Sequence, residues 1–163
     1  MIWQKSNRGD PRARELADRH YNRQKPGTPQ FVPPGRCCVL YAETDTGKAF
    51  WVTSFPYAQY VKHAWAGAWI CSAFRNEGAG IASQMIREAV AATRSHFGEP
   101  PELGMITFID TRKVKPTKVH GVNTWGYTYI KAGFKLVGKT KGGLLALQLL
   151  PKDMPPAEQA NEY

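Results

Sequence analysis

The sequence predicts an α+β domain with a mixed, mostly antiparallel sheet flanked by helices. Two pairs of β-forming segments are each joined by a short turn, which indicates antiparallel hairpins. Between them, an apolar segment is followed by a helical pattern and then by another apolar segment, an order that calls for a parallel pair of strands. With 163 residues, of which 42% are hydrophobic, the chain has the size of one domain with a real core.

Residues 1–36 are predicted to form a basic helix and a proline-rich loop that belong to this same domain. Asp10 and Pro11 make an N-cap and first-turn pair, and the apolar face of the helix runs to His20 and Tyr21. Prolines and glycines then interrupt regular structure as far as residue 35.

Residues 37–150 are predicted to be the core of the fold, because apolar residues recur there at the spacing of strands or helices. The predicted elements are, in chain order, a hairpin over 37–43 and 48–54, a strand over 68–74, a helix over 81–97, a strand over 105–109, a helix over 124–131 that ends before the C-cap glycine Gly133, and a hairpin over 134–139 and 144–150. Residues 151–163 are predicted to be a loose C-terminal tail.

The charge of the chain is its most unusual property. Twenty-two Lys and Arg residues face thirteen Asp and Glu residues, which gives a formal net charge of +9 and a pI near 9.6. This balance favours a polyanionic partner such as nucleic acid or an anionic cofactor, with a merely solubilising surface as the alternative. The basic residues gather in 1–36, 112–118 and 131–141, as on a surface that tracks phosphates.

The sequence also limits location and metal chemistry. No apolar run approaches the ~18 residues of a membrane span, and residues 1–35 lack a signal-peptide core, so we expect a soluble, cytoplasmic protein without a membrane partner. Cys37, Cys38 and Cys71 are odd in number and lie in apolar runs, so we expect neither a disulfide nor a zinc site. We assign no metal ligand, because metal-ligand spacing is absent among His20, His63, Glu77 and Asp110. The metal requirement and the oligomeric state are left open.

A glycine-rich stretch before the central helix is the first candidate for chemistry. Gly78 and Gly80 stand where backbone N–H groups of a helix N-terminus are unpaired, and such groups bind anions. Arg75 would add a charge-assisted contact. An alternative of equal weight is that Gly78 and Gly80 are turn residues that bind no ligand. The stretch matches neither the P-loop pattern nor the dinucleotide-binding pattern.

Two motifs together resemble the GNAT superfamily of N-acyltransferases. Arg75-Asn76-Glu77-Gly78-Ala79-Gly80 resembles the loop pattern Arg/Gln-x-x-Gly-x-Gly/Ala between a strand and a helix. The segment from Asn123 through Tyr129 to Gly133-Phe134 resembles the closing Asn…Tyr-x-x-x-Gly-Phe signature, with Asn123 one residue nearer the tyrosine than usual. The resemblance covers about 37–150 and implies a GNAT-like fold and acyl transfer to an amine. It implies that an acyl-CoA, or a related acyl or aminoacyl donor, is bound by Arg75, Asn76, Gly78, Ala79 and Gly80.

A narrower resemblance is to the phage Mom family of GNAT-like DNA-modification proteins. It rests on His20-Tyr21, Arg75-Asn76, Asp110, and a late Gly…Tyr…Ala-Gly-Phe…Val-Gly-Lys-Thr segment. The resemblance implies transfer of a carbamoylmethyl, glycinamide-type group to the adenine N6 amine in DNA, which protects that DNA from restriction enzymes. For a phage protein it also implies action in the host cytoplasm.

Four residues are candidates for catalysis. Asp110 ends a buried strand and would orient or deprotonate the amine, or else pair with Arg112 or Lys113, and both interpretations carry equal weight. Tyr129 is the candidate acid for the leaving group, as the resemblance also implies, with a packing tyrosine as its alternative. His20 is a candidate base, although a core histidine is the commoner case. Ser54 is a further polar candidate at a strand end.

DNA contact is predicted for the basic loop Arg112, Lys113, Lys115 and Lys118, which contains no acid. An enzyme that modifies a paired base must extrude it, so Tyr57, Tyr60 and Trp125 are candidate stacking residues, with core filling favoured for Trp125. Two other functions stay open. One is an acyl-CoA-dependent N-acetyltransferase that acts on a small amine or a protein, and the other is a non-catalytic DNA-binding module on a GNAT fold.

Overall fold

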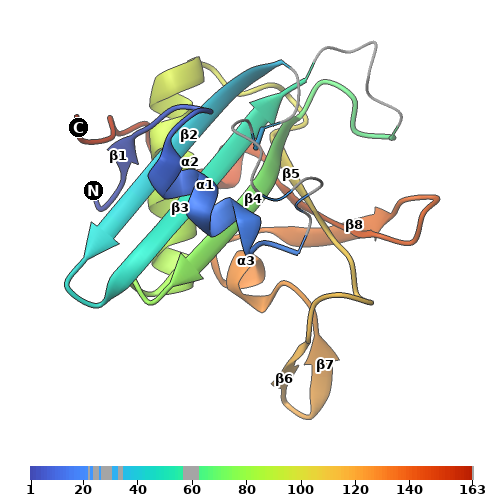
Figure 1. Ribbon diagram of the computed structural model, residues 1–163. Coiled ribbons are helices and arrows are strands. Elements are labelled where there is room, and N and C mark those ends of the chain that lie inside the picture. The colour runs from blue at the N-terminus through green and yellow to red at the C-terminus, as the bar shows by residue number, and fades with distance from the viewer. Residues whose placement is uncertain (22, 24–25, 27–30, 33–34, 57–62, 163) are drawn as a thin grey trace.

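The computed structural model describes residues 1–21, 23, 26, 31–32, 35–56 and 63–162 (Figure 1). In this part of the chain, seven strands form a mostly antiparallel sheet in the order β1-β2-β3-β4-β5-β9-β8, which confirms the predicted α+β class. The elements are β1 (Gln4–Lys5), α1 (Pro11–Asp18), β2 (Arg36–Thr44), β3 (Gly47–Phe55), β4 (Trp69–Glu77), α2 (Ala82–Phe97), β5 (Met105–Ile109), β6 (Thr117–Val119), β7 (Val122–Thr124), α3 (Tyr127–Lys131), β8 (Lys135–Lys139), β9 (Leu145–Leu149) and the 3-10 helix η2 (Pro151–Asp153).

Strands β2 and β3 are apolar on both faces because both faces are covered. Alternate side chains such as Leu40 and Trp51 belong to the larger core, which includes α2, whereas Tyr41 and Phe50 pack in a second cluster with α1. Figure 1 shows α1 in front of the sheet and α2 behind it. Burial on both sides explains why the sequences of these strands are continuous apolar runs and do not alternate between apolar and polar residues.

The parallel pair predicted around the central helix is confirmed, and it is short. Strands β4 and β5 pair only over Trp69↔Met105, Ile70↔Ile106 and Cys71↔Thr107. Beyond Cys71, β4 continues to Glu77 along β3, whereas β5 pairs with β9 along its whole length. The sheet therefore opens between the two strands toward their carboxyl ends.

Three element boundaries differ from the prediction. Strand β4 runs through Arg75 and Asn76, which were predicted to follow it, because both pair with β3. Helix α1 ends at Asp18, so His20 and Tyr21 follow the helix instead of lying on it. The helix predicted from Thr124 begins at Tyr127, because Thr124 pairs with Thr117 in a two-stranded ribbon, β6–β7, that the sequence pattern did not indicate.

The C-terminal segment is ordered, in contrast to the predicted loose tail. Met154 and Ala160 are buried in the main core. The Asn161 carbonyl accepts a 2.9 Å hydrogen bond from the Lys5 N–H, and the Asn161 N–H donates to the Trp3 carbonyl at 2.9 Å. The segment is held in place because its apolar side chains pack in the main core and its backbone is paired with that of the first residues.

Candidate functional site

A pocket of about 490 Å³ occupies the opening between β4 and β5. Its walls come from β4, β5, α3, the residues that follow α1, and the basic loop after β5. Of the sequence-predicted residues, it brings together His20, Arg75, Asn76, Tyr129, Lys113 and Lys115. The carboxyl ends of diverging strands are a common place for ligands, because side chains from several segments converge there.

Tyr129 places a phenolic hydroxyl in this pocket from helix α3. The hydroxyl lies 3.7 Å from the Cys71 Sγ, and the ring packs edge-on against Phe74 and Phe134. Burial, and then the neighbouring Cys71 sulfur, raise the pKa of Tyr129 well above its ordinary value. The hydroxyl is therefore protonated at neutral pH, as a proton donor must be.

Gly126 determines where helix α3 begins. Its φ of 70° is a left-handed conformation that glycine adopts without strain. A Cβ at this position would lie 2.4 Å from the Ile109 Cδ1 and 2.5 Å from the Leu147 Cδ1. A side chain here would have to displace both methyl groups and hold a strained φ, so glycine lets α3 start this close to β5 and β9.

Arg75 lines the pocket as part of a charge network. Its guanidinium pairs with Glu77 through Nε and donates through Nη1 to the Arg19 carbonyl at 3.0 Å. Arg19 binds Glu77 with two 2.8 Å hydrogen bonds. These bonds, those from Arg19 first, lower the pKa of Glu77 to about 2. Glu77 therefore stays ionised and orients Arg75 at the pocket wall.

The glycine loop is bonded internally and lies beyond the pocket lining, which ends at Asn76. The Asn76 side chain accepts from the Ala79 N–H at 2.9 Å and donates to the Gly80 carbonyl at 2.8 Å. Thr46 and Thr44 donate to the carbonyls of Gly78 and Ala79. The Ala79 N–H is thus already used, which argues against its predicted role as a donor to an anion. Helix α2, whose N-cap Ile81 makes no side-chain capping bond, presents its first N–H groups next to this loop.

His20 and Tyr21 reach the pocket from the turn after α1. Their rings stack with centroids 4.7 Å apart, and the Tyr21 hydroxyl donates to the Phe108 carbonyl at 3.3 Å. Burial raises the pKa of Tyr21. Tyr21 therefore anchors the turn to β5, and the turn holds His20 in the pocket wall.

Asp110 and Ser54 do not line the pocket. Asp110 is 7% exposed and accepts from the Arg112 N–H and Nε at 3.0 Å each. These bonds lower the pKa of Asp110, and the geometry matches the ion-pair alternative rather than contact with an amine. The buried Ser54 hydroxyl lies 2.7 Å from that of Ser72, which does line the pocket.

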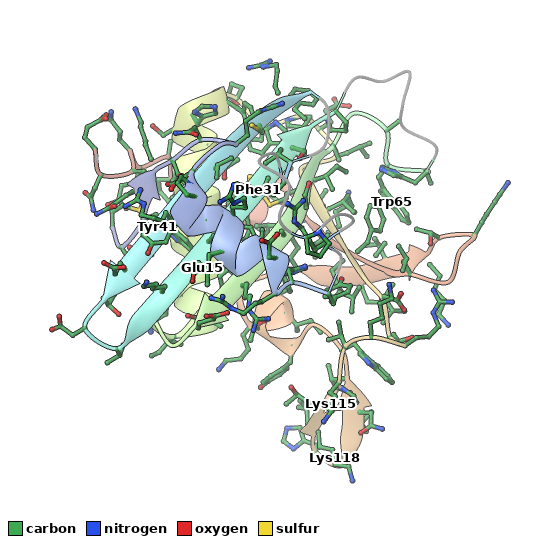
Figure 2. The ribbon with its side chains drawn as sticks, in the orientation of Figure 1. Glu15, Phe31, Tyr41, Trp65, Lys115 and Lys118 are labelled. Atoms are coloured by element: carbon green, nitrogen blue, oxygen red, sulfur yellow. The ribbon has the colours of Figure 1, made fainter. Side chains whose placement is uncertain are left out.

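The basic residues after β5 separate into two places. Lys113 and Lys115 line the pocket, whereas Lys118 lies on the β6–β7 ribbon that projects from the molecule (Figure 2). Arg112, with a side chain 75% exposed, is held by Asp110. The predicted basic loop therefore borders the pocket at its start and leads into the ribbon at its end.

Of the candidate stacking residues, Trp125 belongs to the protein core. Its Nε1 donates to the Val114 carbonyl at 2.9 Å and its ring packs against the main core, in line with the favoured alternative. Tyr57 and Tyr60 lie outside the described residues. Asn123, part of the motif that resembles the GNAT signature, is exposed on β7 and does not line the pocket.

An aromatic group that sequence reasoning missed adjoins the pocket. The rings of His63 and Trp65 lie 4.9 and 6.0 Å from that of the pocket residue Phe108 (Figure 2 labels Trp65). Burial lowers the pKa of His63, and its Nδ1 accepts from the Trp65 N–H at 3.1 Å. The signal in the sequence was the two-residue spacing of His63 and Trp65 just before an apolar strand.

Comparisons of the chain with models of protein families, with curated proteins and with solved structures find no match. Within the described residues, no group of three or more His, Cys, Asp or Glu residues is placed to hold a metal ion, and no helix is long and apolar enough to cross a membrane. The three cysteines are free thiols.

Proposed function

We propose that the protein is a GNAT-like DNA-modification enzyme that transfers an acyl-derived, glycinamide-type group to the adenine N6 amine, as proteins of the Mom family do. One observation carries this proposal. The opening between β4 and β5 combines the hydroxyl of Tyr129, which lies against Cys71, with the basic residues Lys113 and Lys115. An acid inside the pocket suits group transfer, and lysines beside it suit a substrate that carries phosphates.

The proposed reaction assigns one role to each residue of the pocket. The N6 nitrogen attacks the donor carbon, so that a new C–N bond forms and the bond from that carbon to its leaving group breaks. Tyr129 gives its proton to the leaving group, and His20 receives the proton that the amine loses. Tyr129 then regains a proton from solvent, and His20 releases its proton to solvent. With an acyl-CoA or a related acyl or aminoacyl donor, the attacked atom is the carbonyl carbon and the first product is an N6-acyl adenine; a glycyl group attached in this way has the same composition as a carbamoylmethyl group.

Binding of the donor is assigned to the side of the pocket nearest the glycine loop. Arg75, oriented by Glu77, faces the anionic part of the donor. The first N–H groups of α2 lie outside the pocket lining and would contact only a donor that extends past Asn76, Gly78 and Gly80. Asp110 acts in this scheme by holding Arg112 at the rim. The volume of about 490 Å³ is in the range of pockets that enclose small ligands.

Mass analysis of nucleosides from the DNA of cells that express the protein tests the proposal. A heavier adenosine is expected in those cells and is expected to be absent in cells that express the Tyr129→Phe variant at the same level. Unmodified DNA together with acetyl transfer to small amines in vitro would instead identify an N-acetyltransferase. Salt-sensitive DNA binding without any product would identify a non-catalytic binding module.

A further inference from the structure

We infer that the β6–β7 ribbon enters the major groove of duplex DNA and thereby places the pocket beside the base that is modified. This inference rests on the proposed DNA substrate and deepens it, because it names the form of DNA that is recognised and the element that recognises it. The ribbon is a separate two-stranded sheet, and Figure 1 shows it extending away from the seven-stranded sheet.

The ribbon has the shape that a groove requires. Its pairs are Thr117↔Thr124, Lys118↔Asn123 and Val119↔Val122, and its turn contains His120 and Gly121 with φ values of 50° and 78°. Two residues with positive φ are typical of the tight turns that match the twist of paired strands. Two strands about 4.8 Å apart, with their side chains, fit a major groove about 12 Å wide.

One face of the ribbon carries the groups that read base edges. Lys118 and Asn123 are exposed cross-strand partners, so they share a face, opposite to that of Val119 and Val122. Asparagine bonds to the N6 and N7 atoms of adenine in the major groove, and lysine bonds to O6 and N7 of guanine. Val122, 64% exposed, lies on the opposite face and would point out of the groove.

The charge of the surrounding segment fits the same partner. Residues 111–152 contain nine Lys and Arg residues and not one Asp or Glu, whereas the thirteen other basic residues are matched by all thirteen acids. The formal net charge of the chain therefore equals that of the segment bearing this ribbon. Such a segment suits contact with phosphates on both sides of a groove.

The ribbon and the pocket are joined by a few residues. The pocket lining includes Lys113, Lys115 and Thr117, and Thr117 is the first residue of β6. Figure 2 shows Lys115 near the start of the ribbon and Lys118 on the ribbon itself. A ribbon seated in the groove would therefore hold the pocket against the adjacent base pairs. An extruded adenine would have only a short path to Tyr129.

Fluorescence anisotropy with labelled duplex and single-stranded DNA of one sequence, without any donor, tests the inference. Lys118→Glu is expected to weaken duplex binding about tenfold, and Asn123→Ala about fivefold, with much smaller effects on the single strand. Lys48→Glu changes the net charge by the same amount at the distant β2–β3 turn, and we expect less than a twofold effect. Circular dichroism of each variant verifies folding.

The outcomes separate this inference from the proposed function. Unchanged duplex binding by both ribbon variants overturns the inference, and so does an equal loss for duplex and single strand, which would mean general attraction to phosphates. Binding of an acidic polypeptide that competes with duplex and depends equally on Asn123 would also overturn it. Ribbon-dependent duplex binding without modified adenosine supports the inference while the proposed chemistry fails.

Discussion

Tyr129 shows how local packing controls chemistry at the scale of one residue. The same α3 turn carries Tyr127, which lines the same pocket, but only the Tyr129 hydroxyl lies against Cys71 in a buried position. Burial raises the pKa of Tyr129, because the charged phenolate is poorly solvated there. The difference between two tyrosines two residues apart therefore lies in their surroundings.

Tyr129→Phe is predicted to lower the rate of group transfer by about 10²-fold or more, because the leaving group loses its proton donor. Tyr127→Phe is the matched control, with an expected change of less than threefold. Single-turnover rates of adenosine modification with both variants provide the measurement. Equal rates for the two variants would remove Tyr129 from the proposed mechanism, and unchanged DNA binding by both would locate any loss in the chemical step.

The residues of the pocket were predictable to different degrees. Arg75 and Tyr129 belong to spaced motifs next to recognisable elements, so their neighbourhood followed from the order of strands and helices. Asp110 was predicted at the correct strand end, but the direction of its side chain depends on Arg112, two residues later. The positions of His63 and Trp65 follow from contacts with Phe108, far along the chain, and spacing alone does not contain such contacts.

At the scale of elements, one carboxylate connects α1 with β4. Glu77 at the end of β4 binds Arg19 at the C-cap of α1 and also Arg75. This connection fixes the residues that follow α1, and those residues include His20 and Tyr21. The pocket wall therefore depends on an ion network outside the hydrophobic core.

Glu77→Gln is predicted to lower the free energy of unfolding at pH 7 by about 1 kcal/mol, a value that allows for solvent screening. The pKa of Glu77 is lowered from 4.5 to about 2 on folding, so its stabilisation is complete above 4.5 and is lost as the pH falls toward 2. Urea unfolding of both proteins from pH 7 to pH 2 should show the difference shrinking over that window. Glu15→Gln, which removes a 3.9 Å contact to the same Arg19, should change stability by less than about 0.5 kcal/mol.

Elements were predictable where burial imposes a pattern. The strands β2, β3 and β5 bury most of their residues and the helix α2 buries one face, and apolar periodicity located each of them within a few positions. The β6–β7 ribbon buries almost nothing, so its sequence contains no apolar pattern, and only the pairing across His120-Gly121 defines it. An element that faces solvent on both sides lacks the signal that burial creates.

At the scale of the whole molecule, the two ends of the chain close one side of the core together. Trp3 is fully buried and donates from Nε1 to the Met85 carbonyl at 2.8 Å, while Met154 and Ala160 lie in the same core cluster. Arg94 of α2 donates to the Pro155 carbonyl at 3.0 Å. The C-terminal segment is thus part of the domain, although its prolines and polar residues suggested otherwise.

Removal of residues 151–163 is predicted to lower the free energy of unfolding by about 3 kcal/mol, because the Met154 and Ala160 side chains and the core surface that they cover return to water. Equilibrium urea unfolding measures this loss. Gln159→Ala, an exposed change in the same segment, should stay within about 0.5 kcal/mol of the parent. A truncated chain as stable as the parent would mean that the segment contributes nothing to folding.

The stretch of chain that carries the net charge contains the β6–β7 ribbon and the β8–β9 hairpin, so we expect a polyanion to attract these elements most strongly. Such attraction acts before contact, so it would favour encounters in which these elements face the polyanion. Salt weakens this attraction over a Debye length of about 8 Å under physiological conditions, so ionic strength would act mainly on the association rate constant. The excess of basic residues in 111–152 would thus influence what fraction of collisions with a polyanion leads to binding.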